Sequence, residues 1–298
     1  MGARRWRFSV AIALTCLLVL ASAAGAGIPP GYYARVDASS PAKLRATVHA
    51  IIKAGHVKIP YSAPTTDVWN VLERADQDPA DSSRIRDVYR NASYPKFGAG
   101  NNRYQREHAW PKSFGFPHNE AANFCYTDCH MLFLADGGYN AARSNNVYDD
   151  CAAPTETYPV EGTGCVDKRQ DGFPEGRWEV WEGRRGDVAR ALLYMDVRYE
   201  GEGAEPDLVL TDDINRIEAS NTGRNLDVAY MGILSTLLRW NEQDPVSPAE
   251  RRRNDVVYSY QRNRNPFVDH PEWVRVIFGG VGADSTRALA PAQVRDRH

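Results

Sequence analysis

The sequence predicts an α+β chain that folds as one mostly helical domain. About 270 residues remain after an N-terminal leader, which is enough for a single large core. Several stretches repeat apolar residues at helical spacing, whereas only short segments in the middle of the chain have the composition of strands. No linker or internal repeat divides the chain. We therefore expect one folded domain over residues 28–280 and a disordered tail over residues 281–298.

The first 26 residues have the pattern of a secretory signal peptide. Three arginines form a basic start, an apolar run follows, and Ala24-Gly25-Ala26 is an A-x-A cleavage site. The run is shorter than the roughly 20 residues of a membrane span, and no second run follows it. We expect a secreted or periplasmic monomer that does not associate with a membrane.

The charge of the chain argues against general nucleic-acid binding over a broad surface. Removal of the three leader arginines takes the formal net charge from −2 to −5. Proteins that coat nucleic acids usually carry a basic patch. Any site for a polyanion must therefore be local and must rest on a few arginines or a metal ion.

Two helices and a strand are expected in the first third of the domain. Apolar residues at positions 44, 48, 51 and 52 share one helical face, and this helix ends near Gly55. A second helix over residues 67–76 would be capped by Thr66. Residues 85–90 then have the composition of a strand.

Three longer helices are expected in the second half. They cover residues 186–199, with one apolar stripe, residues 226–244, and residues 248–261. Arginine runs on these helices are interpreted as solvated faces. Residues 263–273 are interpreted as a turn-rich closure with Phe267 buried, rather than as phosphate contacts through nearby arginines.

Four cysteines remain after the leader, and an even number in an exported chain suggests two disulfides. The alternative is four buried free thiols. If Cys125 and Cys129 lie in extended chain, their Cα atoms are roughly 13 Å apart, beyond the approximately 7 Å that a disulfide allows. Each would instead pair with Cys151 or Cys165, in either order, and so fix a polar excursion over residues 144–177.

Residues 105–111 are expected to form a strand that ends abruptly. Glu107 and His108 are adjacent, so in a regular strand they point to opposite faces and serve one site only where the strand ends or bulges. Pro111 favours such an end because it cannot continue a ladder. Trp110 is expected to pack in the core rather than to stack on a base.

A second polar segment follows about twenty residues later. Residues 130–134 are expected to form a short strand, Gly137-Gly138 a turn, and Asn140 the start of a helix on which Asn140, Arg143 and Ser144 share a face. Carboxylate and amide oxygens favour Mg²⁺ or Ca²⁺. A neutral histidine can take a proton from water, and Arg143 could hold a phosphate oxygen. This set fits metal-assisted phosphodiester hydrolysis.

Several motifs, in this order, resemble the bacterial endonuclease I family of exported, sugar-non-specific nucleases. The motifs are REHAWPKS at 106–113, D-x-H-x-L at 128–132 and N-x-x-R-S-N at 140–145, with further similarity at 185–199 and 261–273. The resemblance covers nearly the whole mature chain. It implies a ββα-metal unit set among helices, and cleavage of DNA and RNA that leaves 5′-phosphate ends.

The resemblance also implies roles for single residues. His108 matches the general base, and Glu107 and Asn140 match the ligands of one Mg²⁺, a site that is also expected to accept Ca²⁺ or Mn²⁺. Further residues of the motifs are expected to support these groups or to contact the substrate; they are Arg106, Asp128, His130 and Ser144.

Two other functions fit parts of the sequence. A non-catalytic nucleic-acid-binding or uptake protein on the same fold would have lost the base, yet His108 is present. A secreted serine hydrolase would pair His108 or His130 with Ser113 or Ser144, but the chain lacks a G-x-S-x-G elbow.

Overall fold

The computed structural model describes residues 27–151, 156–157, 165–167 and 176–279. The expected signal peptide and the expected C-terminal tail lie outside these residues. Within them, no helix combines the length and the apolar character needed to cross a bilayer.

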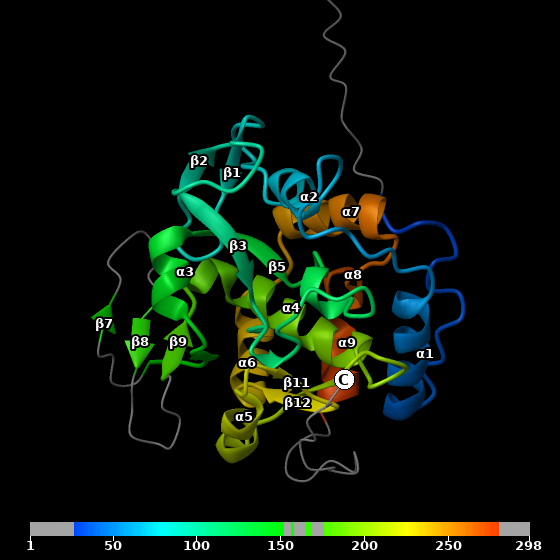
Figure 1. Ribbon diagram of the computed structural model, residues 1–298. Helices are drawn as coiled ribbons and strands as arrows, with labels where there is room; N and C mark the ends of the chain where they lie inside the picture. Colours follow the sequence, from blue (N-terminus) through cyan, green and yellow to red (C-terminus); the bar gives the residue numbers. More distant parts are fainter. Residues whose placement is uncertain (1–26, 152–155, 158–164, 168–175, 280–298) are drawn as a thin grey trace, which may run out of the picture.

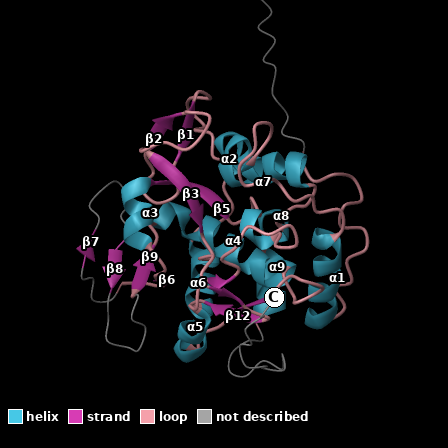
Figure 2. Ribbon diagram, in the orientation of Figure 1, coloured by secondary structure: helices cyan, strands magenta, loops and turns pink. Residues whose placement is uncertain are grey.

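Helices are the longest regular elements of the described chain and surround several small sheets, as the α+β prediction requires (Figures 1 and 2). The helices are α1 (Pro41–Lys53), α2 (Val68–Ala75), α3 (Gly137–Arg143), α4 (Arg185–Arg198), α5 (Ile214–Ser220), α6 (Leu234–Gln243), α7 (Pro248–Gln261), α8 (Pro266–Asp269) and α9 (Glu272–Phe278), with the 3₁₀ turns η1 (Cys125–Thr127) and η2 (Glu182–Arg184).

The strands are short and pair mostly in twos. They are β1 (Arg84–Arg86), β2 (Ser93–Pro95), β3 (Tyr104–His108), β4 (Phe114–Gly115), β5 (Leu132–Asp136), β6 (Val147–Tyr148), β7 (Glu156–Thr157), β8 (Cys165–Asp167), β9 (Arg177–Glu179), β10 (Asp207–Leu210), β11 (Arg224–Asn225) and β12 (Val228–Met231). β1 pairs with β2, β3 with β5, β10 with β12 and β4 with β11. A four-stranded sheet has the order β6-β9-β8-β7.

The core forms around α4, which is buried on nearly all sides rather than along one stripe. It packs against α6, α1 and α8. Burial on every side brings charged residues inside. Arg190 is fully buried and binds Glu250 through two bonds of 2.7 and 2.6 Å. On α7, Arg253 is buried beside Asp76 at 2.7 Å. The interpretation of the arginine runs as solvated faces is therefore wrong for these two residues.

Four of the predicted helices are confirmed closely, and one is half wrong. The predicted positions are occupied by α1, α2, α4 and α7. In the range 226–244, only the second half is helical, as α6. The first half contains β12, whose parallel pairing with β10 gives it partners that lie about twenty residues earlier. Apolar spacing over a short segment fits a buried strand as well as a helix.

Three boundaries differ from the predictions. The N-cap of α2 is Asp67 rather than Thr66, and Asp67 exchanges capping-box bonds with Asn70. The strand predicted over residues 85–90 is limited to β1, because Asp87 binds the amides of residues 89, 90 and 92 and turns the chain. The strand predicted from His130 begins two residues later, as β5.

The cysteine prediction is corrected by η1. Cys125 and Cys129 are buried free thiols, so neither is bonded to residues 144–177. The predicted pairing assumed that Cys125 and Cys129 lie in extended chain, whereas residues 125–127 form the helical turn η1. Cys151 is disulfide-bonded, and the side chain of Cys165 lies outside the described part of the chain. The segment itself is not only a surface excursion, because β6 to β9 build a sheet from it.

Other expectations hold in the core. Trp110 is fully buried, and its indole donates to the carbonyl of Phe114 at 3.1 Å. Phe267 is fully buried on α8. Arg264 binds Asp269 at 2.6 Å, which accounts for its charge without a phosphate.

Candidate active site

The candidate site is built on β3, β5 and α3. β3 and β5 are antiparallel, with Glu107 opposite Phe133 and His108 opposite Leu132. α3 follows β5 directly and contacts both strands (Figure 1). Asp136 starts this helix by accepting the amides of Gly138 and Tyr139 at 2.9 and 3.2 Å. The helix therefore begins at Gly137, three residues before the predicted start.

Glu107 is held by one of its two carboxylate oxygens. The Tyr89 hydroxyl and the Arg143 guanidinium both donate to Oε1 at 2.7 Å. Oε2 makes no hydrogen bond to the described residues, and it is not among the atoms sealed from solvent. Burial raises the pKa of the Glu107 carboxyl above its usual value, while Arg143 acts in the opposite direction. The arrangement fixes the carboxylate and leaves one oxygen free to accept.

Arg143 binds protein rather than solvent. Its side chain is 1% exposed, and it donates to Glu107, to the carbonyls of His108 and Ala109 at 2.9 and 2.7 Å, and to the carbonyl of Asn146 at 3.2 Å. The guanidinium also lies 4.4 Å from the ring centre of Tyr148. These contacts do not fit the expected phosphate clamp. Arg143 instead orients Glu107 and the end of β3.

His108 is the last residue of β3, and its imidazole is almost fully buried. Nε2 lies 3.0 Å from the carbonyl oxygen of Tyr126. Because a carbonyl can only accept, Nε2 carries the proton and Nδ1 is the accepting nitrogen. Nδ1 has no partner among the described residues and is not sealed from solvent. Burial lowers the pKa of His108 to about 3, so the ring is neutral near pH 7.

Asn140 and Ser144 differ in how they meet the site. Asn140 is half-buried, and its amide nitrogen donates to Gln105 Oε1 at 3.1 Å, which leaves Oδ1 without a described partner. Ser144 lies past the end of α3 with φ 48° and is exposed. It therefore does not continue the helical face of Asn140 and Arg143, contrary to the prediction.

The donor set can be compared with the needs of a metal ion. Glu107 Oε2, from β3, and Asn140 Oδ1, from α3, accept no hydrogen bond from the described residues. Hard divalent cations prefer such oxygens. No group of three or more His, Cys, Asp and Glu side chains suited to a metal occurs in the described ranges. A cation held here would therefore need water or substrate oxygens to complete its shell.

The other face of β3 carries one cation, Arg106, among aromatic rings. The Arg106 guanidinium lies 3.4 Å from the ring centre of Tyr61 and 4.5 Å from that of Trp69, and it donates to the Tyr61 carbonyl. The rings of Tyr61 and His108 are 5.9 Å apart. Arg106 is half-exposed and has no carboxylate within ion-pair distance among the described residues. A held cation without a counter-ion suits an anionic ligand.

Asp128 and His130 belong to the core. Asp128 is fully buried and accepts from the hydroxyls of Tyr194 and Tyr199, both at 2.8 Å, and from Gln261 at 2.7 Å. His130 Nε2 lies 3.0 Å from the carbonyl oxygen of Asn263. These bonds join the segment before β5 to α4 and to the turn after α7. They do not fit the expected contact with substrate.

Sequence reasoning missed three tyrosines that shape the site. Tyr89 holds Glu107, Tyr126 sets the tautomer of His108 through its backbone carbonyl, and Tyr61 packs on Arg106. A contact made by a backbone carbonyl cannot be predicted from residue types, because every residue has one. Tyr89 was missed because residues 85–90 were interpreted as a strand. In the structure Tyr89 lies in a turn that begins at Asp87.

Comparison with known proteins identifies the chain. The Endonuclease I family model matches residues 42–272. The chain is 40% identical over 251 residues to an extracellular ribonuclease of Bacillus amyloliquefaciens, covering 83% of this chain and 78% of that protein. It is 39% identical over 251 residues, with the same coverage, to an extracellular ribonuclease of Bacillus subtilis (strain 168). The chain therefore belongs to the Endonuclease I family.

Proposed function

We propose that this chain is an exported, Mg²⁺-dependent endonuclease that hydrolyses phosphodiester bonds of DNA and RNA and leaves 5′-phosphate ends. Membership of the family supports a nuclease, and the extracellular ribonucleases that resemble the chain support export and an RNA substrate.

The observation that carries the proposal is the state of His108. Its protonated nitrogen donates to the Tyr126 carbonyl, so the unprotonated Nδ1 is left without a partner among the described residues. A neutral ring with a free accepting nitrogen can take the proton of a water molecule as that water attacks phosphorus. The bond to Tyr126 also holds the resulting imidazolium in place.

Glu107 and Asn140 would hold the metal ion through Oε2 and Oδ1, and Mg²⁺ fits these oxygen donors. When bound, the ion supplies charge stabilisation for the phosphate and the leaving oxygen. The protein prepares this arrangement through Tyr89 and Arg143, which fix the carboxylate by its other oxygen. Supporting contacts of this kind hold a ligand in the orientation that the ion requires.

The open edge of β3 lets groups from both of its faces serve one phosphate. β3 pairs only with β5 in the described part of the chain, so its other edge has no strand beside it. Glu107 lies on the α3 face and His108 on the opposite face, as strand alternation requires. A phosphate placed along the free edge at the strand end can meet both. Arg106, two residues before His108 and on the same face, would bind the neighbouring phosphate.

A cleavage assay tests the function directly. The purified mature chain is incubated with plasmid DNA, single-stranded DNA and RNA, with Mg²⁺ or with EDTA. The proposal requires cleavage of all three substrates with Mg²⁺ and none with EDTA. Binding without cleavage would support the non-catalytic alternative, and cleavage that persists in EDTA would contradict the role of the metal.

A further inference from the structure

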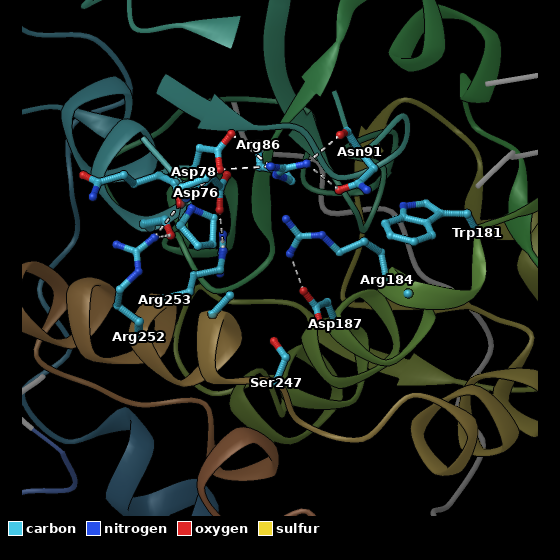
Figure 3. A pocket seen from close by; sticks show the side chains of 16 residues that line it. Asp76, Asp78, Arg86, Asn91, Trp181, Arg184, Asp187, Ser247, Arg252 and Arg253 are labelled. Carbon is cyan, nitrogen blue, oxygen red and sulfur yellow. Dashed lines mark hydrogen bonds and ion pairs between the residues drawn. The ribbon is translucent and has the colours of Figure 1, made fainter. Parts of the chain in front are cut away.

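A separate cavity of about 270 Å³ lies between the β1–β2 segment, η2 and the start of α7 (Figure 3). None of Arg106, Glu107, His108, Asn140 and Arg143 lines it. Its lining combines arginine and aspartate side chains with Asn91 and the indole of Trp181. The cavity is therefore distinct from the candidate active site, and its chemistry must be considered by itself.

Three hydrogen-bond donors in this cavity have no acceptor among the described residues. Arg184 binds Asp187 through Nη1, and its Nη2 has no partner. Asn91 Oδ1 accepts from Arg86 at 3.4 Å, so its amide nitrogen faces away from that contact. The indole nitrogen of Trp181 is buried without a hydrogen bond. A buried donor without an acceptor is costly, so the Trp181 indole marks a place for a ligand that accepts. The Arg184 and Asn91 donors are half-buried rather than sealed from solvent, and they are available to the same ligand.

The three donors face one part of the cavity. In Figure 3 the Arg184 guanidinium lies between Asp187 on one side and Arg86 and Asn91 on the other, and the Trp181 indole lies next to Asn91. Asn91 lies between β1 and β2 and has φ 53°, a left-handed conformation. Arg86 is fixed by two bonds of 3.0 Å to Asp78. The donors are thus held by protein contacts before any ligand arrives.

The charge of the lining selects among possible acceptors. Four arginines and three aspartates line the cavity, which leaves one positive charge in excess. A ligand that carries a single negative charge and several acceptor oxygens balances this excess. A phosphodiester has this charge near pH 7, whereas a phosphate monoester carries a charge between −1.5 and −2.

We propose that the cavity binds a phosphodiester group of a polynucleotide, through Arg184, Asn91 and Trp181, at a distance from the bond that is cleaved. The inference that the phosphodiester belongs to a polynucleotide rests on the proposed function. The inference that the cavity binds a phosphodiester is independent of that function, because it follows from the donors and the charge of the lining. Such a site would hold a strand on the enzyme between successive cleavage events.

Dimethyl phosphate, a phosphodiester without bases or sugar, tests the site without any cleavage. Calorimetry on the mature protein should detect binding of this probe. Arg184→Gln should weaken it by about 10-fold or more, the effect of losing a charge-assisted hydrogen bond. Asn91→Asp replaces the donor by a carboxylate of the same shape and should abolish binding, while Trp181→Phe should weaken it several-fold. Arg251→Gln is the matched control, because Arg251 is an exposed arginine of α7 that does not line the cavity.

Further measurements distinguish a polynucleotide from free phosphate as the ligand, and they show whether a variant loses binding because it is misfolded. A single-stranded oligonucleotide should bind to the His108→Gln protein more tightly than dimethyl phosphate does, and Asn91→Asp should weaken it. Tighter binding of inorganic phosphate than of dimethyl phosphate at pH 8 would overturn the phosphodiester assignment. The site would be overturned if dimethyl phosphate did not bind to the parent protein. It would also be overturned if Asn91→Asp and Trp181→Phe proteins, with the same stability as the parent, bound dimethyl phosphate as tightly as the parent does. Loss of nuclease activity in the parent protein would affect only the proposed function.

Discussion

Replacement of His108 separates its role in chemistry from its role in the fold. Gln has an amide nitrogen at the same number of bonds from Cβ as Nε2 of histidine, so His108→Gln can keep the bond to the Tyr126 carbonyl. It has no nitrogen that accepts a proton near pH 7. His108→Ala removes both functions. The two variants should therefore agree in rate and differ in stability.

The expected magnitudes follow from the contacts. Loss of a general base costs about 10² to 10⁴ in rate, which raises the barrier by about 3 to 5 kcal/mol. In His108→Ala the buried Tyr126 carbonyl also loses its donor, which lowers the free energy of unfolding by about 1–3 kcal/mol. In His108→Gln this second loss should be small. Only the rate effect is then common to both proteins.

Plasmid nicking at saturating Mg²⁺ measures the rate, and urea unfolding followed by circular dichroism measures the stability. A rate loss below about threefold in His108→Gln would refute the assignment of the base, because general-base catalysis contributes far more. Equal destabilisation by Gln and Ala would refute the inferred bond between Nε2 and the Tyr126 carbonyl, even if both proteins were inactive.

Four other expectations follow from single contacts. Asn140→Ala should weaken Mg²⁺ binding in calorimetry and recover part of its activity at high Mg²⁺; an unchanged affinity would remove Asn140 from the metal site. Arg143→Met should lower the free energy of unfolding by about 3–5 kcal/mol in urea, because Glu107 loses its buried partner; a loss below about 1 kcal/mol would show that the pair contributes little. The buried His130 has its pKa lowered to about 4 by desolvation, so the unfolded state takes up its proton first. The free energy of unfolding should fall as the pH drops from 6.5 towards 4, by up to about 3 kcal/mol from this group, and a His130→Gln protein with the same pH slope would contradict the assignment. Peptide mapping of the unreduced protein should show Cys151 linked to Cys165, and any linked peptide that contains Cys125 would contradict the free thiols.

The parts of the fold that follow from local sequence are its separate helices. α1 and α7 have apolar residues at helical spacing and Ser-Pro starts, so local signals decide both. β12 is different, because its strand conformation depends on pairing with β10, about twenty residues away in sequence. No local window contains that information. Tertiary pairing overrides short-range periodicity in such segments.

The cysteines show how one turn can overturn a sound distance argument. In extended chain, Cys125 and Cys129 would lie too far apart for a disulfide. η1 shortens that distance, so the argument no longer applies, yet the two thiols are still not bonded. Both are buried in the core, where a thiol behaves as a small apolar group. The even number of cysteines in an exported chain therefore did not mean that all four are bonded.

The sequence motifs supplied the residues of the candidate site, but the contacts that each of them makes could not be predicted. The motifs identify Glu107, His108, Asn140 and Arg143, which the structure places around β3 and α3. Sequence alone assigned Arg143 to a phosphate because an arginine in a polar motif is usually exposed. Its burial depends on Tyr148, which comes from the following strand, and on the carbonyls at the end of β3. The arginine that remains available for a phosphate is Arg106, because its neighbours are aromatic rings rather than carboxylates.

The end of β3 is compatible with the proposal that the adjacent Glu107 and His108 serve one site. In a strand between two others, side chains on opposite faces cannot meet one ligand, because the neighbouring strands separate the faces. β3 has only β5 beside it among the described strands, and its ladder stops within a residue of His108. At such an open end, a ligand can contact both faces without any bulge. Arg143 satisfies the carbonyls of His108 and Ala109 at this end, so β3 stops without leaving them unpaired. The same buried arginine therefore fixes Glu107 and preserves the open edge that a phosphate would need.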